Sequence, residues 1–236
     1  PKELGQLSNL TQLFLDQNQL TSIPMELCQL NNLSELHLSN NRLTMIPKEL
    51  GQLSNLTQLF LTQNFLSHIP KEIGQLTKLK HFYLDANQIV AIPKEFGQLI
   101  HLTRIDLDQN HLTSIPQEFG QLMNVTQIYL DQNRLEFLPK ELEQLTKLDR
   151  LYLHGNEKLG IATEILGPTW PEVDKEGIPA KPADILNYYF RIQADRQPLN
   201  EAKLILVGFG AVGKTSLVNR LIHNTFDPTS KKTEGI

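Results

Sequence analysis

Residues 53–75, LSNLTQLFLTQNFLSHIPKEIGQ, decide the fold, because close copies of this stretch follow one another from the first residue to about residue 165. Each copy has 23 residues and opens on a leucine, and no copy before the last gains or loses a residue. The opening leucines are Leu7, Leu30, Leu53, Leu76, Leu99, Leu122 and Leu145. A fixed period of this length indicates a solenoid in which each copy packs only on its neighbours.

Within a copy, the pattern L-x-x-L-x-L-x-x-N-x-L-x-x-I-P resembles the leucine-rich repeat. In the third copy Leu59 and Leu61 alternate with Phe60, and this period of two predicts a short strand with both leucines inward and Phe60 outward. The predicted fold class is therefore α/β, a leucine-rich-repeat solenoid with a curved face of parallel strands, one from each copy.

Equivalent positions of successive copies form columns of residues 23 apart in the sequence. Two such columns are interpreted as structural. One holds asparagines, expected to bond backbone groups where each strand turns inward, since losing such a buried partner costs roughly 1–3 kcal/mol. These are Asn18, Asn41, Asn64, Asn87, Asn110, Asn133 and Asn156. The other holds prolines, expected to begin the convex side, where a missing N–H breaks no ladder bond. These are Pro24, Pro47, Pro70, Pro93, Pro116 and Pro139.

Composition excludes several classes of function. The chain of 236 residues is 40% hydrophobic with a net charge of −4, and no basic stripe favours nucleic-acid binding. No stretch approaches the roughly 20 apolar residues of a membrane span. The single cysteine, Cys28, occupies a column that holds glycine in five other copies and favours a reducing, cytoplasmic compartment. The histidines show no metal-ligand spacing, so we expect no metal site at them.

The outward residues of successive strands are expected to form columns about 4.8 Å apart. The central column is rich in aromatic residues: Phe14, His37, Phe60, Tyr83, Asp106, Tyr129 and Tyr152. A flanking column is rich in carboxylates: Asp16, Ser39, Thr62, Asp85, Asp108, Asp131 and His154. Exposed aromatic residues beside carboxylates are typical of protein interfaces, although aromatic residues also suit strands for structural reasons alone.

These columns predict a concave face that binds a polypeptide with basic residues, either a separate protein or another domain of the same protein. The residues assigned to this face are Phe14, Phe60, Tyr83, Asp85, Asp108, Tyr129, Asp131 and Tyr152.

The repeats are predicted to occupy residues 1–168 and a connector residues 169–200. In the seventh copy the leucine after Asn156 comes one residue late, and residues 167–182 have the glycine and proline content of a loop. Trp170, within this loop, is expected to cover the open apolar end of the array. Apolar residues at helical spacing predict an amphipathic helix over about 182–195 that packs on the last repeat, with a partner-binding helix as the alternative.

Residues 202–222, AKLILVGFGAVGKTSLVNRLI, predict a strand, a glycine-rich loop and a helix around G-x-x-x-x-G-K-T. Glycines in such a loop let backbone N–H groups face phosphate, the lysine adds a positive charge, and the threonine hydroxyl suits Mg²⁺. The predicted phosphate-binding residues are Gly208, Gly210, Val212, Gly213, Lys214, Thr215 and Ser216. The loop by itself fits GTP or ATP.

Residues 201–236 resemble the start of a Ras-like GTPase, and their combination with the upstream repeats resembles the Roco family, in which leucine-rich repeats precede a Roc GTPase domain and a COR domain. Thr233, 19 residues after Lys214, matches the switch threonine that reaches Mg²⁺ beside Thr215. The resemblance implies GTP and GDP binding with Mg²⁺, slow GTP hydrolysis in the intact protein, dimerisation through COR and a regulatory role for the repeats.

The sequence ends at Ile236 before any D-x-x-G or N-K-x-D motif. We therefore expect this chain alone to hold no nucleotide tightly and to be inactive in hydrolysis. Two alternatives stay open: an ATPase switch protein that carries repeats, and a plain leucine-rich-repeat scaffold or effector. The plain scaffold leaves Lys214 and Thr215 without a role, and in ATPase switches the repeats usually lie on the other side of the nucleotide domain.

Overall fold

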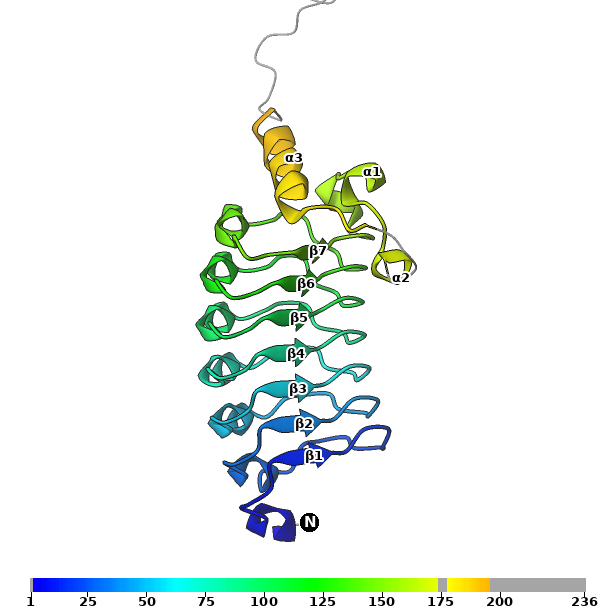
Figure 1. Cartoon of the computed structure of the whole chain (residues 1–236). Coiled ribbons are helices and arrows are strands. Elements are labelled where there is room, and N and C mark those ends of the chain that lie inside the picture. Colours follow the sequence, from blue (N-terminus) through cyan, green and yellow to red (C-terminus); the bar gives the residue numbers. More distant parts are fainter. Residues whose placement is uncertain (1, 174–177, 196–236) are drawn as a thin grey trace, which may run out of the picture. The chain divides into compact units, whose positions relative to one another are not determined.

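The computed structural model describes residues 2–173 and 178–195, and these residues belong to one compact unit. Figure 1 shows the copies stacked one on another, each with one short strand and, on the opposite side of the coil, one short helix. The strands are β1 (Gln12–Phe14), β2 (Glu35–His37), β3 (Gln58–Phe60), β4 (His81–Tyr83), β5 (Arg104–Asp106), β6 (Gln127–Tyr129) and β7 (Arg150–Tyr152).

The helices that face away from the strands are 3₁₀-helices. They are η1 (Lys2–Gln6), η2 (Leu27–Gln29), η3 (Lys48–Gln52), η4 (Lys71–Gln75), η5 (Lys94–Gln98), η6 (Gln117–Gln121), η7 (Lys140–Gln144) and η8 (Glu157–Leu159). Three α-helices follow: α1 (Thr163–Leu166), α2 (Trp170–Val173) and α3 (Pro182–Asp195).

The seven strands form one parallel sheet in sequence order, which confirms the predicted strand face. Each strand pairs with the residues one period away, as in Leu36 with Leu59 and Leu59 with Phe82. This register lines up equivalent positions of all copies, so any column of the sequence becomes a column of neighbouring side chains in space.

The core is built by the inward residues of each copy. In the third copy Leu59 and Leu61 are fully buried, as the alternation with Phe60 predicts. Pro47 has an extended backbone and immediately precedes η3, so the missing proline N–H interrupts no ladder bond. The same arrangement holds at Pro70, which precedes η4.

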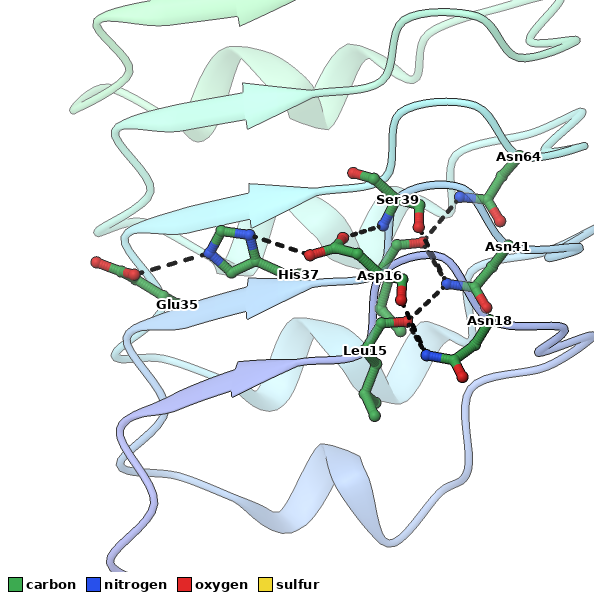
Figure 2. Close-up of polar contacts among 9 residues, drawn as sticks. Leu15, Asp16, Asn18, Glu35, His37, Ser39, Asn41 and Asn64 are labelled. Atoms are coloured by element: carbon green, nitrogen blue, oxygen red, sulfur yellow. Dashed lines mark hydrogen bonds and ion pairs between the residues drawn. The ribbon is translucent and has the colours of Figure 1, made fainter.

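The asparagine column bonds backbone groups, as predicted, and it also links successive copies. Asn41 donates to the carbonyl oxygens of Leu15 and Leu38 at 2.9 and 3.0 Å, and its Oδ1 accepts a hydrogen bond from the backbone N–H of Leu20 at 3.0 Å. Figure 2 shows this ladder running from Asn18 to Asn64. Asn18 differs because it is exposed and donates only to carbonyls of its own copy, at Leu15 and Asp16.

The predicted C-terminal helix is confirmed as α3, and it packs on the last repeats. Ile185 and Tyr189 of α3 are buried in the same core as the repeats, and the backbone N–H of Leu138 donates to the Tyr189 hydroxyl at 3.1 Å. Figure 1 shows α1 and α3 at the β7 end of the array. These contacts cover apolar side chains that an open last repeat would expose to water.

The segment expected to be a loop contains a short helix, α2, and Trp170 at its start does not cover the open end of the array. Its ring lies instead against the strand face, edge-on to Tyr129 and Tyr152 with centroids 5.5 and 6.2 Å apart. The expectation for Trp170 was wrong because α3 already supplies the apolar cover at that end. Among the helices that the structure describes, none is long and apolar enough to cross a membrane.

Candidate interaction surface

The N-terminal half of the strand face carries a stack of rings. Phe14, His37, Phe60 and Tyr83 follow one another on β1 to β4 with centroid separations of 4.3, 4.0 and 4.5 Å. Phe14 is 60% exposed, and His37, Phe60 and Tyr83 are partly buried. These rings lie one period apart in the sequence, and the parallel register brings them into van der Waals contact.

Carboxylates flank this stack. His37 lies between Asp16 and Glu35, with its Nδ1 3.6 Å from Asp16 Oδ2 and its Nε2 3.8 Å from Glu35 Oε2, as Figure 2 shows. Asp16 also accepts a hydrogen bond from the backbone N–H of Ser39 at 2.7 Å. The first copies thus present aromatic faces bordered by acidic groups.

Asp106 interrupts the aromatic column on β5. Its Oδ2 accepts a hydrogen bond from Arg104 at 2.9 Å, and the Arg104 guanidinium lies over the rings of Tyr83 and Tyr129, 5.1 and 4.5 Å from their centroids. The same guanidinium is 5.8 Å from the centroid of the Trp170 ring. A cation held against aromatic rings and paired with a carboxylate is a stable arrangement at a partly dehydrated surface.

Tyr129 and Tyr152, expected to be exposed on the strand face, are each only 2% exposed. Their rings stack at 5.0 Å, and Trp170 covers both. The segment that carries Trp170, here called the covering segment (residues 167–173), is held by His154, whose Nε2 is 2.9 Å from the carbonyl oxygen of Gly167. The aromatic surface open to a partner therefore lies on the first four strands.

An acidic cavity of about 470 Å³ lies between the strand face and the covering segment. Four aspartates line it, Asp85, Asp106, Asp108 and Asp131, together with the rings of Tyr129 and Trp170. Among the described residues, one group of carboxylates has the spacing that a metal ion needs: oxygen atoms of Asp85, Asp106 and Asp108 lie within 4.8 Å of one another. The cavity thus brings four carboxyl groups together in a partly buried place.

Burial changes the acid–base behaviour of this cavity. It raises the pKa of Asp108 from 3.8 to about 9, and the neighbouring Asp106 carboxyl, with the charges of Asp85 and Asp131, adds to the rise. Burial also raises the pKa of Asp85 and of Asp131, while hydrogen bonds to each offset part of the increase. Crowded carboxylates without matching cations prefer to stay protonated.

The predicted interface residues fall into two groups. Phe14, Phe60 and Tyr83 belong to the ring stack, whereas Asp85, Asp108, Tyr129 and Asp131 line the cavity. Tyr152 lies beneath Trp170.

The predicted nucleotide site lies outside the described residues. Its members are Gly208, Gly210, Val212, Gly213, Lys214, Thr215, Ser216 and Thr233.

Sequence reasoning missed two residues that line the cavity, Asp106 and Trp170, and the arginine that pairs with Asp106. Asp106 was placed in the aromatic column, Trp170 was assigned to the end of the array, and Arg104 was given no role. A signal for Asp106 existed, because it is the only carboxylate in that column and Asp85 and Asp108 stand beside it in successive copies. No periodic signal existed for Trp170, because it lies after the last copy.

Residues 9–30, 31–89 and 100–157 match the family described as leucine-rich repeat. The repeats of this chain are leucine-rich repeats. Residues 203–236, which follow the leucine-rich repeats, match the family described as "Ras of Complex, Roc, domain of DAPkinase". The chain thus has leucine-rich repeats followed by a segment similar to a Roc domain.

Solved structures support the same fold for the leucine-rich repeats. A leucine-rich-repeat protein of Leptospira interrogans is 39% identical over 66% of this chain, with a TM-score of 0.58. The ectodomain of the Arabidopsis thaliana receptor kinase GASSHO1/SCHENGEN3, in complex with Casparian strip integrity factor 2, is 39% identical over 65% of this chain, with a TM-score of 0.60. The plant peptide hormone receptor RGFR1, in complex with RGF2, is 34% identical over 66% of this chain, with a TM-score of 0.62.

This chain spans only 45%, 19% and 26% of the lengths of those three chains. A comparison with curated proteins gives no match.

Proposed function

We propose that the leucine-rich repeats are the protein-binding, regulatory arm of a Roco GTPase. The observation that carries this proposal is the order of the two matches, repeats first and the Roc-like segment directly after the connector. In such a protein the predicted phosphate loop binds GTP or GDP, with Mg²⁺ at Thr215 and Thr233, and hydrolysis is slow. Dimerisation through a COR domain and a cytoplasmic location belong to the same proposal.

The strand face is proposed as the binding surface, for a separate protein or for another domain of the same protein. Its open ring stack has the aromatic composition of interface anchors. Its carboxylates complement a partner with basic residues. Two of the similar receptors were solved in complex with a named partner, which supports a binding role for a repeat array of this kind.

Nucleotide choice tests the GTPase part. In a protein that carries these repeats and a complete Roc domain, binding of GTP, GDP and ATP is compared by calorimetry, with and without Lys214→Ala. We expect guanine nucleotides alone to bind, and the variant to lose them because the loop loses its positive charge. Selective binding of ATP would move the assignment to an ATPase switch, and binding of neither nucleotide would leave a scaffold.

The strand face is tested separately with the double variant Phe60→Ala and Tyr83→Ala. Short basic and acidic peptides of equal length are titrated against the chain and the variant. We expect the chain to prefer basic peptides and the variant to bind them at least tenfold more weakly, since two stacked rings are lost. Equal binding by chain and variant would contradict the assignment of this surface. Glu136, exposed and far in sequence from the ring stack, supplies a control in Glu136→Gln.

A further inference from the structure

In the acidic cavity, a buried carboxylate oxygen lacks a hydrogen-bond donor. Asp106 is only 7% exposed, and although its Oδ2 is bonded to Arg104, its buried Oδ1 has no hydrogen-bond partner. A carboxylate oxygen only accepts hydrogen bonds, so the missing partner is a donor. A buried acceptor without a donor is costly, and a bound donor removes that cost.

The charges that face the cavity do not balance. The carboxylates that line the cavity are Asp85, Asp106, Asp108 and Asp131. Arg104 is already paired with Asp106, and the guanidinium of Arg150 lies over the Trp170 ring, 5.5 Å from its centroid. His154 lies beside Asp131, with its Nδ1 3.5 Å from Asp131 Oδ1. Asp85 accepts a hydrogen bond from the neutral hydroxyl of Thr62 at 2.7 Å. These contacts leave the Oδ1 of Asp106 as an acceptor for an incoming cation, and Asp108 becomes a second acceptor once it loses its proton.

The size and walls of the cavity favour an organic cation over a bare metal ion. Its volume of about 470 Å³ far exceeds the share of one water molecule, about 30 Å³. Trp170 and Tyr129 add apolar surface that a metal ion does not use and that the methylene stem of a basic side chain does. A guanidinium also offers several donors in one plane, which suits carboxylates from neighbouring strands.

We propose that this cavity binds the guanidinium group of an arginine side chain carried by a polypeptide on the strand face, with Asp85, Asp106 and Asp108 as acceptors. This inference rests on the proposed binding role of the strand face and names the chemistry that the C-terminal half of that face recognises. The stem of the arginine lies along Trp170, and the aromatic stack on β1 to β4 takes the neighbouring residues of the same polypeptide.

Trp170 is the only tryptophan of the chain and lines the cavity, so its fluorescence reports occupancy directly. The full chain is titrated with a blocked peptide, Gly-Ser-Arg-Ser-Gly, and with the same peptide carrying citrulline, which keeps the shape of arginine and lacks its charge. We expect a saturable change in Trp170 fluorescence with the arginine peptide and binding at least tenfold weaker with the citrulline peptide. Equal responses, or none to either peptide, would overturn the proposal.

Variants place the binding in the cavity. We expect Asp108→Asn and Asp85→Asn each to weaken binding of the arginine peptide at least fivefold, because each variant loses a carboxyl group that a bound guanidinium would hold in its ionised form, and keeps side-chain size. Asp184→Asn is the matched control, since Asp184 is exposed on α3 and does not line the cavity, and it is expected to leave the affinity unchanged. Equal loss in all three variants would contradict a site in the cavity.

A titration with calcium chloride alone tests the remaining possibility, that the cavity binds a metal ion. Saturable binding of Ca²⁺ that Asp108→Asn abolishes, without binding of the arginine peptide, would make the cavity a metal site and overturn the proposal. Neither Phe60 nor Tyr83 lines the cavity, so the ring-stack variant Phe60→Ala with Tyr83→Ala keeps all of its lining residues. If this variant loses binding of the longer basic peptides but keeps the Trp170 response to the arginine peptide, the ring stack and the cavity are both supported as separate parts of the surface. If the parent chain binds basic peptides through the ring stack but gives no Trp170 response, only the cavity assignment fails.

Discussion

At the scale of single residues, Asp108 makes stability depend on pH. Its pKa is about 9 in the folded chain and 3.8 in an unfolded chain, so between these values the folded state keeps a proton that the unfolded state has lost. The free energy of unfolding therefore falls as pH rises from about 4 to about 9. The contribution of this group is fully present below the lower value and lost above the upper one.

Asp108→Asn removes this titration, so we expect the variant to equal the parent near pH 4 and to exceed it in melting temperature at pH 8. Each kcal/mol gained corresponds to about 2–4 °C in a domain of this size. Thermal unfolding at the two pH values measures the difference. Asp149→Asn, at a side chain that is 76% exposed, is the control and is expected to change neither. A difference of the same size at both pH values would contradict the prediction.

Asn87 tests the asparagine ladder. It donates to the carbonyl oxygens of Leu61 and Leu84 at 2.9 and 3.0 Å and accepts from the backbone N–H of Leu66 at 3.0 Å, all buried. Asn87→Ala leaves these groups unpaired, so we expect a loss of at least about 1–3 kcal/mol in the free energy of unfolding by urea.

Asn18→Ala is the matched control for Asn87, because Asn18 is exposed and bonds only within its own copy. Its expected effect is within about 0.5 kcal/mol. Equal losses in both variants would show that the links between copies add nothing.

At the scale of elements, the glycine column sets how closely neighbouring 3₁₀-helices approach. A Cβ added at Gly74 of η4 would lie 2.4 Å from the carbonyl oxygen of Glu95, a backbone atom of the next copy. We expect Gly74→Ala to cost about 1–3 kcal/mol by overpacking, measured by urea unfolding. At Gly5 the nearest atom would lie 3.0 Å away, so Gly5→Ala should cost clearly less. The reverse order would contradict this account.

Cys28 occupies this column in the first copy, where η2 has three residues in place of the five in η3 to η7. Burial, with the nearby charge of Glu49, raises the pKa of its thiol to about 11. The thiol is therefore protonated and unreactive at neutral pH, which agrees with a packing role.

At the scale of the whole described unit, stability at the C-terminal end depends on α3. Tyr189→Phe keeps the ring and removes the hydroxyl that accepts the Leu138 N–H, so we expect a loss of about 1–3 kcal/mol and faster exchange of that amide with solvent. Hydrogen exchange followed by mass spectrometry measures it. Tyr188→Phe on the same helix is the control, and its partly buried side chain is expected to matter less. Protection of the Leu138 amide that stays the same in Tyr189→Phe would refute the role of this bond.

Most of the solenoid follows from the period. The alternation of Leu59, Phe60 and Leu61 predicts the strand and its two faces, and the fixed spacing predicts the parallel register. Asn41 and Pro47 also lie where local chemistry requires them. The position of a residue can be predicted from the sequence when every copy has the same type of residue there, because neighbouring copies then provide nearly identical surroundings.

The candidate binding surface was predictable only in part. Sequence alone determined that Phe14, Phe60 and Tyr83 share one face with a row of carboxylates. Only the tertiary structure decided that Trp170 packs edge-on against Tyr129, so that the row of aspartates lines a partly open cavity. The physical reason is that the covering segment lies beyond the last repeat, where no period fixes its path and its place depends on contacts between residues distant in sequence.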